Sequence, residues 1–172
     1  MFNVNIYLET SISGPSVKEA AGVWWVECVT GRPEPDFNKD FRRGYLWKGK
    51  TTENALTLEL LRDALFTLTK PCSIRVNTQC VLIVNAMKKR HVGPMQKEKS
   101  WAERWSENGW INAKRKPVNH ADLWQQVCGR LGMHMAGFDS WQNPYRDKMR
   151  EGLEIVLASR GQEDPWKDLR KK

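Results

Sequence analysis

The order of secondary-structure patterns in the first 77 residues restricts the fold more than any other feature of the sequence. Three segments rich in alternating, β-branched or aromatic residues come first, at residues 2–9, 21–29 and 45–50. Leucines at helical spacing then predict a helix over about 53–69, which Pro71 prevents from continuing. CSIRVN follows as a fourth strand. Three consecutive strands predict an antiparallel meander, and the strand–helix–strand step predicts a parallel strand joined by a right-handed crossover.

The rest of the chain combines helical patterns with one more strand. Helices are predicted over 78–89 and 99–109, and a third is predicted to begin at the N-cap Asn119 and end at Gly132. MHMAGF predicts the fifth strand, and Asn143 with Pro144 opens a last helix. The sequence therefore predicts an α/β fold with a mixed five-stranded sheet, an antiparallel meander plus parallel strands, flanked by helices. We expect one domain over 1–160, a basic insertion at about 88–118, and a loosely held polar C-terminal tail over 161–172.

Length and apolar content indicate an ordinary globular protein. A chain of 172 residues is long enough to bury one sizeable core, and no apolar run approaches the ~20 residues that a membrane-spanning helix needs. The N-terminal segment MFNVNIYLE alternates like a strand and lacks the pattern of a signal peptide. We therefore expect a cytoplasmic protein with no membrane partner. The four cysteines form no CxxC pair, which predicts free thiols in apolar surroundings.

Positive charge is concentrated in one part of the chain. Residues 86–116 hold nine Lys and Arg against three Glu, which is +6 of the total net charge of +8. Four tryptophans lie in or near this segment, and we expect them to pack as a small core that holds the basic side chains together: Trp101, Trp105, Trp110 and Trp124. This concentration favours a polyanionic partner, although a merely solvated charged face stays open as the alternative.

Four motifs lie in the order and at the elements expected of one enzyme family. They are IYLETS at the end of the first strand, TTEN at the start of the long helix, RVNTQCV at the fourth strand, and W-x3-W-x4-W-x2-A-x2-K-P-V-x4-L-W-Q from Trp101 to Gln125. Over roughly residues 3 to 158 the chain resembles type 1 ribonuclease H. The resemblance implies a ribonuclease H-like fold, with the basic insertion as a Trp-rich basic protrusion.

The resemblance also implies a chemistry, and the sequence departs from it. The family cleaves the RNA strand of an RNA–DNA hybrid with two divalent metals, which four carboxylates hold. Those four positions fall here on Glu9, Thr57, Asn77 and near Arg150, so that Glu9 is the one carboxylate among them. We therefore predict that the two-metal centre and its ribonuclease activity are lost. No cofactor is then expected, and Mg²⁺ or Mn²⁺ would be needed only if the nuclease activity persisted.

Two further acids could replace part of the missing set. Glu53 lies one turn before Thr57, and Asp147 lies one turn before Arg150. A single-metal site of Glu9, Glu53 and Asp147 is therefore an alternative. The competing interpretation is that both acids interact with the positive end of a helix dipole.

The chain keeps residues that the resemblance assigns to substrate binding, although it lacks most of the carboxylates that the resemblance assigns to the metals. The resemblance implies that Asn54 reads the minor groove of a hybrid and that Gln79 contacts substrate, although Asn54 could instead cap the helix. It also implies that the basic protrusion grips DNA-strand phosphates, which gives salt-dependent affinity. The predicted nucleic-acid-binding residues are Asn54, Gln79, Lys88, Lys89, Arg90, Lys97, Lys99, Lys114, Arg115 and Lys116.

Three functions are consistent with these residues. The favoured one is a ribonuclease H-like protein that binds a hybrid or related duplex without cutting it. The first alternative is a divergent metal-dependent ribonuclease H. The second is a protein-interaction scaffold that uses the x-P-x-P loop at 32–35 and an exposed Trp166 in the tail.

Overall fold

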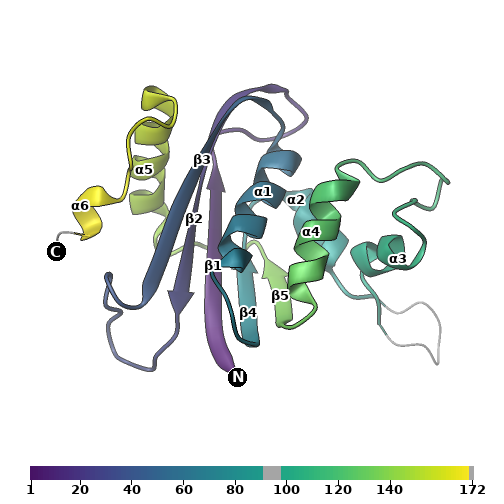
Figure 1. Ribbon diagram of the computed structural model, residues 1–172, viewed down its shortest axis with the longest axis horizontal. Coiled ribbons are helices and arrows are strands. Elements are labelled where there is room, and N and C mark those ends of the chain that lie inside the picture. The colour runs from purple at the N-terminus through teal and green to yellow at the C-terminus, as the bar shows by residue number, and fades with distance from the viewer. Residues whose placement is uncertain (91–97, 171–172) are drawn as a thin grey trace.

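The chain forms one mixed sheet with helices on both faces (Figure 1). The computed structural model describes residues 1–90 and 98–170. The strands are β1 (Phe2–Thr10), β2 (Lys18–Cys28), β3 (Phe41–Thr51), β4 (Cys72–Asn77) and β5 (Met135–Asp139). The helices are α1 (Glu53–Phe66), α2 (Val81–Met87), α3 (Trp101–Glu107), α4 (Ala121–Leu131), α5 (Arg146–Ser159) and α6 (Lys167–Arg170). The predicted order of elements is confirmed, and α6 is an addition to it.

The sheet has the predicted mixture of strand directions. Its order is β3-β2-β1-β4-β5, in which β1, β2 and β3 form an antiparallel meander and β4 and β5 run parallel to β1. Tyr7 on β1 lies beside Asn77 on β4, and Glu9 lies two residues further along β1. Because parallel strands end at the same edge of a sheet, the end of β1 and the end of β4 come together.

The two faces of the sheet carry different cores. One face packs on α1, α2 and α4 through a mainly aliphatic cluster that includes Leu56, Leu61 and Ile74. The other face packs on α5 and the C-terminal segment through an aromatic cluster that includes Tyr7 and Trp25. In Figure 1, α5 and α6 lie on one side of the sheet and α1 and α4 on the other. The two layers fix α1 and α5 relative to the end of β1, where both helices begin.

Several predicted helix ends were wrong by a few residues. The long helix ends at Phe66, and the hydroxyl of its C-cap Thr67 donates a hydrogen bond to the Ala64 carbonyl at 2.7 Å. Its N-cap is Thr52, whose side chain accepts from the Ala55 N–H, so Asn54 does not cap it. The N-cap of α4 is His120, in a left-handed conformation, and not Asn119. The third strand begins at Phe41 and is longer than predicted.

The C-terminal segment is not the loose polar tail that its composition predicts. Trp166 is 1% exposed, and its indole N–H donates to the Gly44 carbonyl at 3.2 Å. Its ring lies over Gly152 of α5, where an added Cβ would come within 2.3 Å of the indole. Residues 161–169 therefore belong to the folded domain, and the predicted exposure of Trp166 was wrong.

The cysteines are free thiols, as predicted. Cys72 and Cys80 are buried, and Cys28 and Cys128 are partly buried. Burial raises the pKa of the Cys80 and Cys128 thiols to about 11. Among the residues described, no helix is both long enough and apolar enough to cross a bilayer.

Candidate nucleic-acid site

A cavity of about 220 Å³ lies where β1 ends and α1 and α5 begin. Its lining brings together Glu9 from β1, Glu53 and Thr57 from α1, and Arg146 and Arg150 from α5. Backbone pairing places Asn77 beside β1, and the next residue, Thr78, lines the cavity. An adjoining cavity of about 290 Å³ shares Glu9, Gln79 and Arg146 and is also lined by Asn143 and Asp147. The predicted acid positions therefore gather around the end of β1.

Glu9 is buried and paired with two arginines. Its side chain is 3% exposed, and its Oε1 lies 3.4 Å from the Arg146 Nε and 3.5 Å from the Arg150 Nη1. Burial raises the pKa of the Glu9 carboxyl, and the charges of Arg146 and Arg150 oppose part of that rise. The carboxylate that a metal would need is thus already engaged by two cations.

Thr57 and Asn77 offer neutral oxygens where the resemblance implies acids. Both side chains are at most 1% exposed. The Asn77 amide donates a hydrogen bond to the Trp141 carbonyl. Within the described part of the chain, neither the Thr57 hydroxyl oxygen nor the Asn77 amide oxygen has a hydrogen-bond partner. Two buried polar oxygens therefore remain available beside Glu9.

The alternative single-metal site is not assembled. Glu53 lines the first cavity and Asp147 lines the second, with Glu9 between them. Across residues 1–90 and 98–170, no three His, Cys, Asp or Glu side chains are grouped so that they could hold a metal ion. Carboxylate oxygens are the usual protein ligands of such a metal, and the two guanidinium groups beside Glu9 compete for its carboxylate and oppose the approach of a dication. The residues present do not fit a metal centre.

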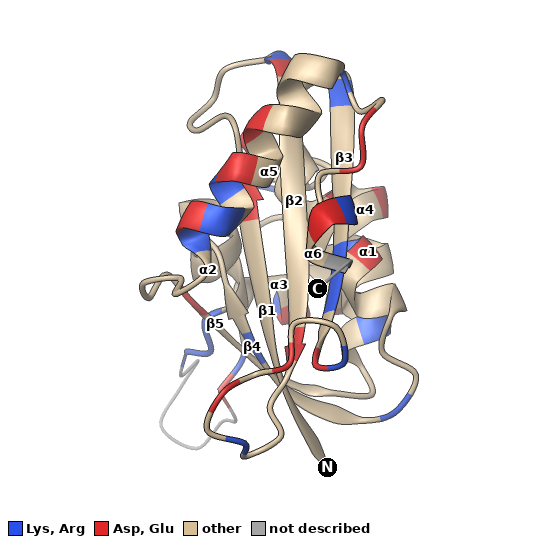
Figure 2. Cartoon of the chain, turned by 90° about the vertical axis from the view of Figure 1, so that its left-hand side faces the viewer, with Lys and Arg blue, Asp and Glu red and all other residues tan. Residues whose placement is uncertain are grey.

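Arg146 belongs to this site and is absent from the predicted set. It precedes Arg150 by four residues, so both side chains lie on the same face of α5. This i, i+4 spacing is visible in the sequence. The two arginines reach Glu9 only because α5 packs beside β1, and sequence periodicity does not reveal that packing. Figure 2 shows that the turns of α5 carry basic and acidic residues side by side.

Gln79 and Asn54 both lie near the cavity. The Gln79 side chain is exposed and its amide donates to the Ser140 carbonyl at 3.3 Å. The Asn54 side-chain oxygen accepts from the Cys80 thiol at 3.2 Å, which joins the start of α1 to the start of α2. Gln79 therefore lines the cavity, and Asn54 lies behind it in contact with the lining residue Cys80.

A second positively charged surface is formed by a short loop between α3 and α4. The basic loop, residues 112–116, is closed by Asn112, whose side-chain oxygen accepts from the backbone N–H groups of Lys114 and Lys116 at 2.9 and 3.1 Å. The Asn112 N–H also donates to the Lys116 carbonyl at 2.9 Å. Lys114, Arg115 and Lys116 are exposed, and no acidic side chain of the described residues forms a salt bridge with them.

The other predicted basic residues are placed differently. Lys89 lies 3.6 Å from Glu103, and Lys99 lies 2.6 Å from Glu107. Arg90 stacks on Trp101, with 4.2 Å between the guanidinium carbon and the ring centre. Lys88 is exposed, and Lys97 lies outside the described residues. Internal pairing reduces the free charge here, so the basic loop is the stronger candidate for an anion contact.

Three of the four tryptophans predicted to pack beside the basic segment do so, and they join the main aliphatic core instead of forming a separate one. Trp124 is 1% exposed, and the Trp105 ring meets it edge to face with 5.4 Å between ring centres. Trp105 and Trp110 both pack against the aliphatic core. The Trp110 carbonyl accepts from the Val118 N–H at 3.0 Å, which closes the segment around the basic loop. Trp101 is the more exposed member, at 38%.

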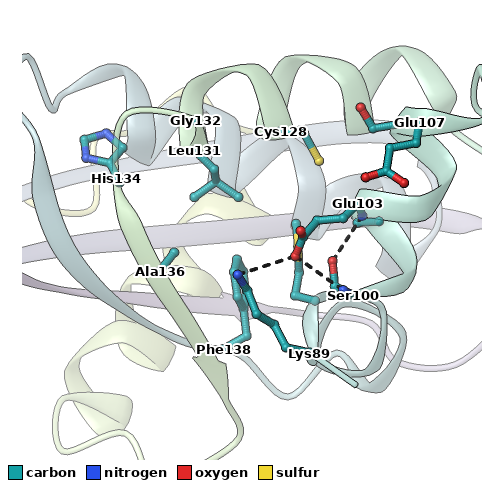
Figure 3. Close-up of a pocket in the computed structure, with 13 residues that line it drawn as sticks. Lys89, Ser100, Glu103, Glu107, Cys128, Leu131, Gly132, His134, Ala136 and Phe138 are labelled. Carbon is teal, nitrogen blue, oxygen red and sulfur yellow. Dashed lines mark hydrogen bonds and ion pairs between the residues drawn. The ribbon is translucent and has the colours of Figure 1, made fainter. Parts of the chain in front are cut away.

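The larger cavity shown in Figure 3 is a different feature. It measures about 480 Å³ and lies between α3, α4 and β5. Two acidic residues line it, and one of them, Glu103, is engaged by Lys89 and by Ser100, which forms a capping box with it at the start of α3. Leu131, Ala136 and Phe138 supply an apolar wall. Of the predicted nucleic-acid-binding residues, the cavity is lined by Lys89, which is already paired.

Sequence similarity decides the family. No family model matches the chain. A ribonuclease H from Stutzerimonas stutzeri is 32% identical over 150 residues, which cover 80% of this chain and 91% of the relative. The chain belongs to the ribonuclease H family.

Solved ribonuclease H structures share the fold. The crystal structure of LC9-RNase H1, described as a type 1 RNase H with the type 2 active-site motif, covers 95% of this chain and 74% of its own, at 16% identity and a TM-score of 0.62. LC11-RNase H1 in complex with an RNA/DNA hybrid covers 92% of this chain and 99% of its own, at 14% identity and a TM-score of 0.53. The mixed sheet and flanking helices predicted from the sequence are those of ribonuclease H.

Most of the positions predicted to match the family's four acids line the cavity at the end of β1. The positions that the sequence motifs assign to the four acids hold Glu9, Thr57, Asn77 and Arg150. Three of them line one cavity, and Arg150 contacts Glu9 directly. The position expected to repel a metal is thus next to the remaining carboxylate.

Proposed function

We propose that this ribonuclease H-like chain binds the backbone of an RNA–DNA hybrid, or of a related duplex, and does not hydrolyse it by the two-metal mechanism. The observation that carries this proposal is the pairing of Glu9 with Arg146 and Arg150. One carboxylate held by two cations has replaced a cluster of acids that would face two dications.

The loss of hydrolysis follows from the charge of the cavity. Thr57 and Asn77 are neutral, and their oxygens offset little of the cost of dehydrating Mg²⁺. Glu9 would have to leave both arginines before it could bind a metal, and the two guanidinium charges would remain close by. Without the metals, no group in the cavity activates a water or stabilises the leaving oxygen in the way the family requires.

Binding is supported by residues outside the altered cavity. The basic loop presents Lys114, Arg115 and Lys116 together, in a conformation that Asn112 fixes. Contacts from Lys and Arg to phosphates give affinity without sequence preference. Gln79 lines the cavity and Asn54 contacts the lining residue Cys80, and an amide in this region can donate to a groove acceptor or a 2′-hydroxyl. The LC11 relative was crystallised with an RNA/DNA hybrid, which makes a hybrid the first substrate to test.

Two measurements on the wild-type protein test the proposal. The first follows cleavage of an end-labelled RNA–DNA hybrid in Mg²⁺ or Mn²⁺, and we expect no cleavage. The second measures hybrid affinity between 50 and 200 mM salt, and we expect the dissociation constant to rise steeply with salt. Metal-dependent cleavage that Glu9→Ala abolishes would establish the divergent nuclease instead. An affinity that is flat across this salt range would contradict backbone binding.

The scaffold alternative has lost one of its two supports. Trp166 is buried against α5 and β3, so it offers no exposed indole to a partner. The x-P-x-P loop at 32–35 is exposed, and its use by a protein partner stays a prediction. That alternative requires a partner that remains bound after nuclease treatment.

A further inference from the structure

We propose that Arg146 and Arg150 form a metal-independent site for one phosphodiester group of the bound nucleic acid. This inference rests on the proposed function and specifies what the altered cavity contacts. The guanidinium groups would meet the backbone phosphate at the place where ribonuclease H enzymes use divalent metals.

The two arginines have more donors than Glu9 can engage. Each meets Glu9 through one nitrogen, Nε of Arg146 and Nη1 of Arg150, and both contacts fall on the same carboxylate oxygen. A guanidinium has five N–H donors, so most of the ten donors remain for another acceptor. The side chains are 56% and 44% exposed, and the remaining donors are open to a ligand. Planar guanidinium forks suit the oxygens of a phosphate.

The cavity walls add neutral donors beside the arginines. The Thr57 hydroxyl lines the cavity, is 1% exposed and has no hydrogen-bond partner within residues 1–90 and 98–170. Ser11 and Ser13 line the same cavity, and Gln79 lies at its rim. A buried hydroxyl without a partner is costly, and a bound anion would accept its proton. With a volume of about 220 Å³, the cavity has room for a tetrahedral anion.

The charge balance indicates the kind of phosphate. Glu9 and Glu53 offset the two arginines within the cavity, and Asp147 lines the cavity next to it. A site with little net charge suits a singly charged diester better than a doubly charged terminal phosphate. We therefore expect weak binding of free phosphate. A backbone phosphate is favoured because the basic loop holds the rest of the duplex.

The start of α5 is anchored, which fixes the arginines. The Tyr145 hydroxyl donates to the Glu27 carboxylate, which also accepts from the Tyr7 hydroxyl at 2.8 Å. The Asn143 side chain accepts from the Tyr145 N–H at 2.9 Å. Arg146 follows immediately in the chain. These contacts hold the first turn of α5 against β1 and β2 before any ligand binds, so less ordering is needed on binding.

The test measures binding of a fluorescent RNA–DNA hybrid by anisotropy in EDTA. We expect wild-type binding to persist without divalent metal, and Arg146→Gln with Arg150→Gln to weaken it about tenfold. We expect the slope of log affinity against log salt to fall by ~0.9, the value for one phosphate contact. Glu9→Gln should tighten binding about threefold, because it removes the carboxylate that competes with the phosphate. Arg160→Gln, at the other end of α5 near Glu19, is the matched control and should change nothing.

The expected effects on hybrid affinity have opposite signs: the arginine variant should weaken binding, and Glu9→Gln should tighten it. A metal site would lose binding in EDTA and in Glu9→Gln, and either loss would overturn the inference. If the double arginine variant binds the hybrid like wild type while basic-loop variants do not, the proposed function stands and this inference fails. If wild-type protein binds inorganic phosphate through the arginines but no hybrid, both the proposed function and the nucleic-acid assignment fail. Calorimetry with inorganic phosphate supplies that last comparison.

Discussion

The basic loop and the arginine pair of α5 both present positive charge, but different groups hold that charge in place. In the loop, Asn112 binds backbone N–H groups, so the side chains of Lys114 to Lys116 stay free of acidic partners in the described residues. In the cavity, Glu9 holds Arg146 and Arg150 by direct charge pairing. The basic loop loses no ion pair when it binds a phosphate. In the cavity, a phosphate has to share the two arginines with Glu9. We therefore expect the basic loop to contribute more to hybrid affinity than the cavity does.

The largest expected effect comes from restoring acids to the cavity. A variant combining Glu9→Asp, Thr57→Glu, Asn77→Asp, Arg150→Asp and Arg146→Gln removes both cations and supplies four carboxylates. We expect Mg²⁺-dependent cleavage of a labelled hybrid at least ~10³-fold faster than wild type, because metal catalysis contributes several kcal/mol to transition-state stabilisation.

Its control is the same variant with Asn77 left unchanged, which should cleave much more slowly. Circular dichroism must show that both variants fold, because Thr57 is buried. Cleavage by wild type as fast as that of an active restored variant would mean that the arginine pair does not prevent catalysis.

The next largest effect should come from the basic loop. Replacing Lys114, Arg115 and Lys116 with Gln is expected to weaken hybrid binding on the order of 100-fold at low salt and to lower the salt slope by up to ~2.7, for three phosphate contacts. Anisotropy titrations at several salt concentrations measure both quantities. Lys89→Gln with Lys99→Gln is the matched control, since those charges are already paired with acids, and it should have a smaller effect. Equal effects in the two variants would remove the distinction between free and paired charge.

A third prediction separates the geometry of the loop from its charge. Asn112→Ala leaves every basic residue in place and removes the acceptor that closes the loop. We expect about tenfold weaker binding with an unchanged salt slope, because the charges must be ordered on binding. Asn119→Ala, an exposed asparagine of the same segment, serves as the control in the same titration. Wild-type affinity in Asn112→Ala would show that charge alone is sufficient.

The smallest expected effect concerns stability and pH. Burial raises the pKa of Glu9 in the folded protein, so the folded state binds its proton more tightly than the unfolded state does. Wild type should therefore lose stability relative to Glu9→Gln as the pH rises from ~4 through the raised pKa. We expect Glu9→Gln to be more stable than wild type at neutral pH, with the difference shrinking in acid. Urea denaturation at several pH values measures it, and a less stable variant at neutral pH would mean that the arginine pairs outweigh the cost of burial.

Local patterns predicted most of the fold. The leucine spacing that ends before Pro71 located α1, and CSIRVN coincides with β4. Those segments have one face for the core and clear breaks at their ends, so their own residues determine them.

The parts that were missed depend on contacts between distant segments. Trp166 stands among polar and charged neighbours, and its burial requires Gly152 and the Gly44 carbonyl, which come from α5 and β3. Arg146 gains its meaning from Glu9, which lies more than a hundred residues earlier in the chain. Sequence periodicity describes which face a residue occupies, but not which partner that face meets.

The position of Trp166 also affects how the protein is made. The aromatic side of the sheet remains open on a growing chain until this indole has emerged from the ribosome and covered Gly152. The chain must be synthesised through Trp166 before that layer can close, so α5 and its arginines cannot reach their final places before that residue is made.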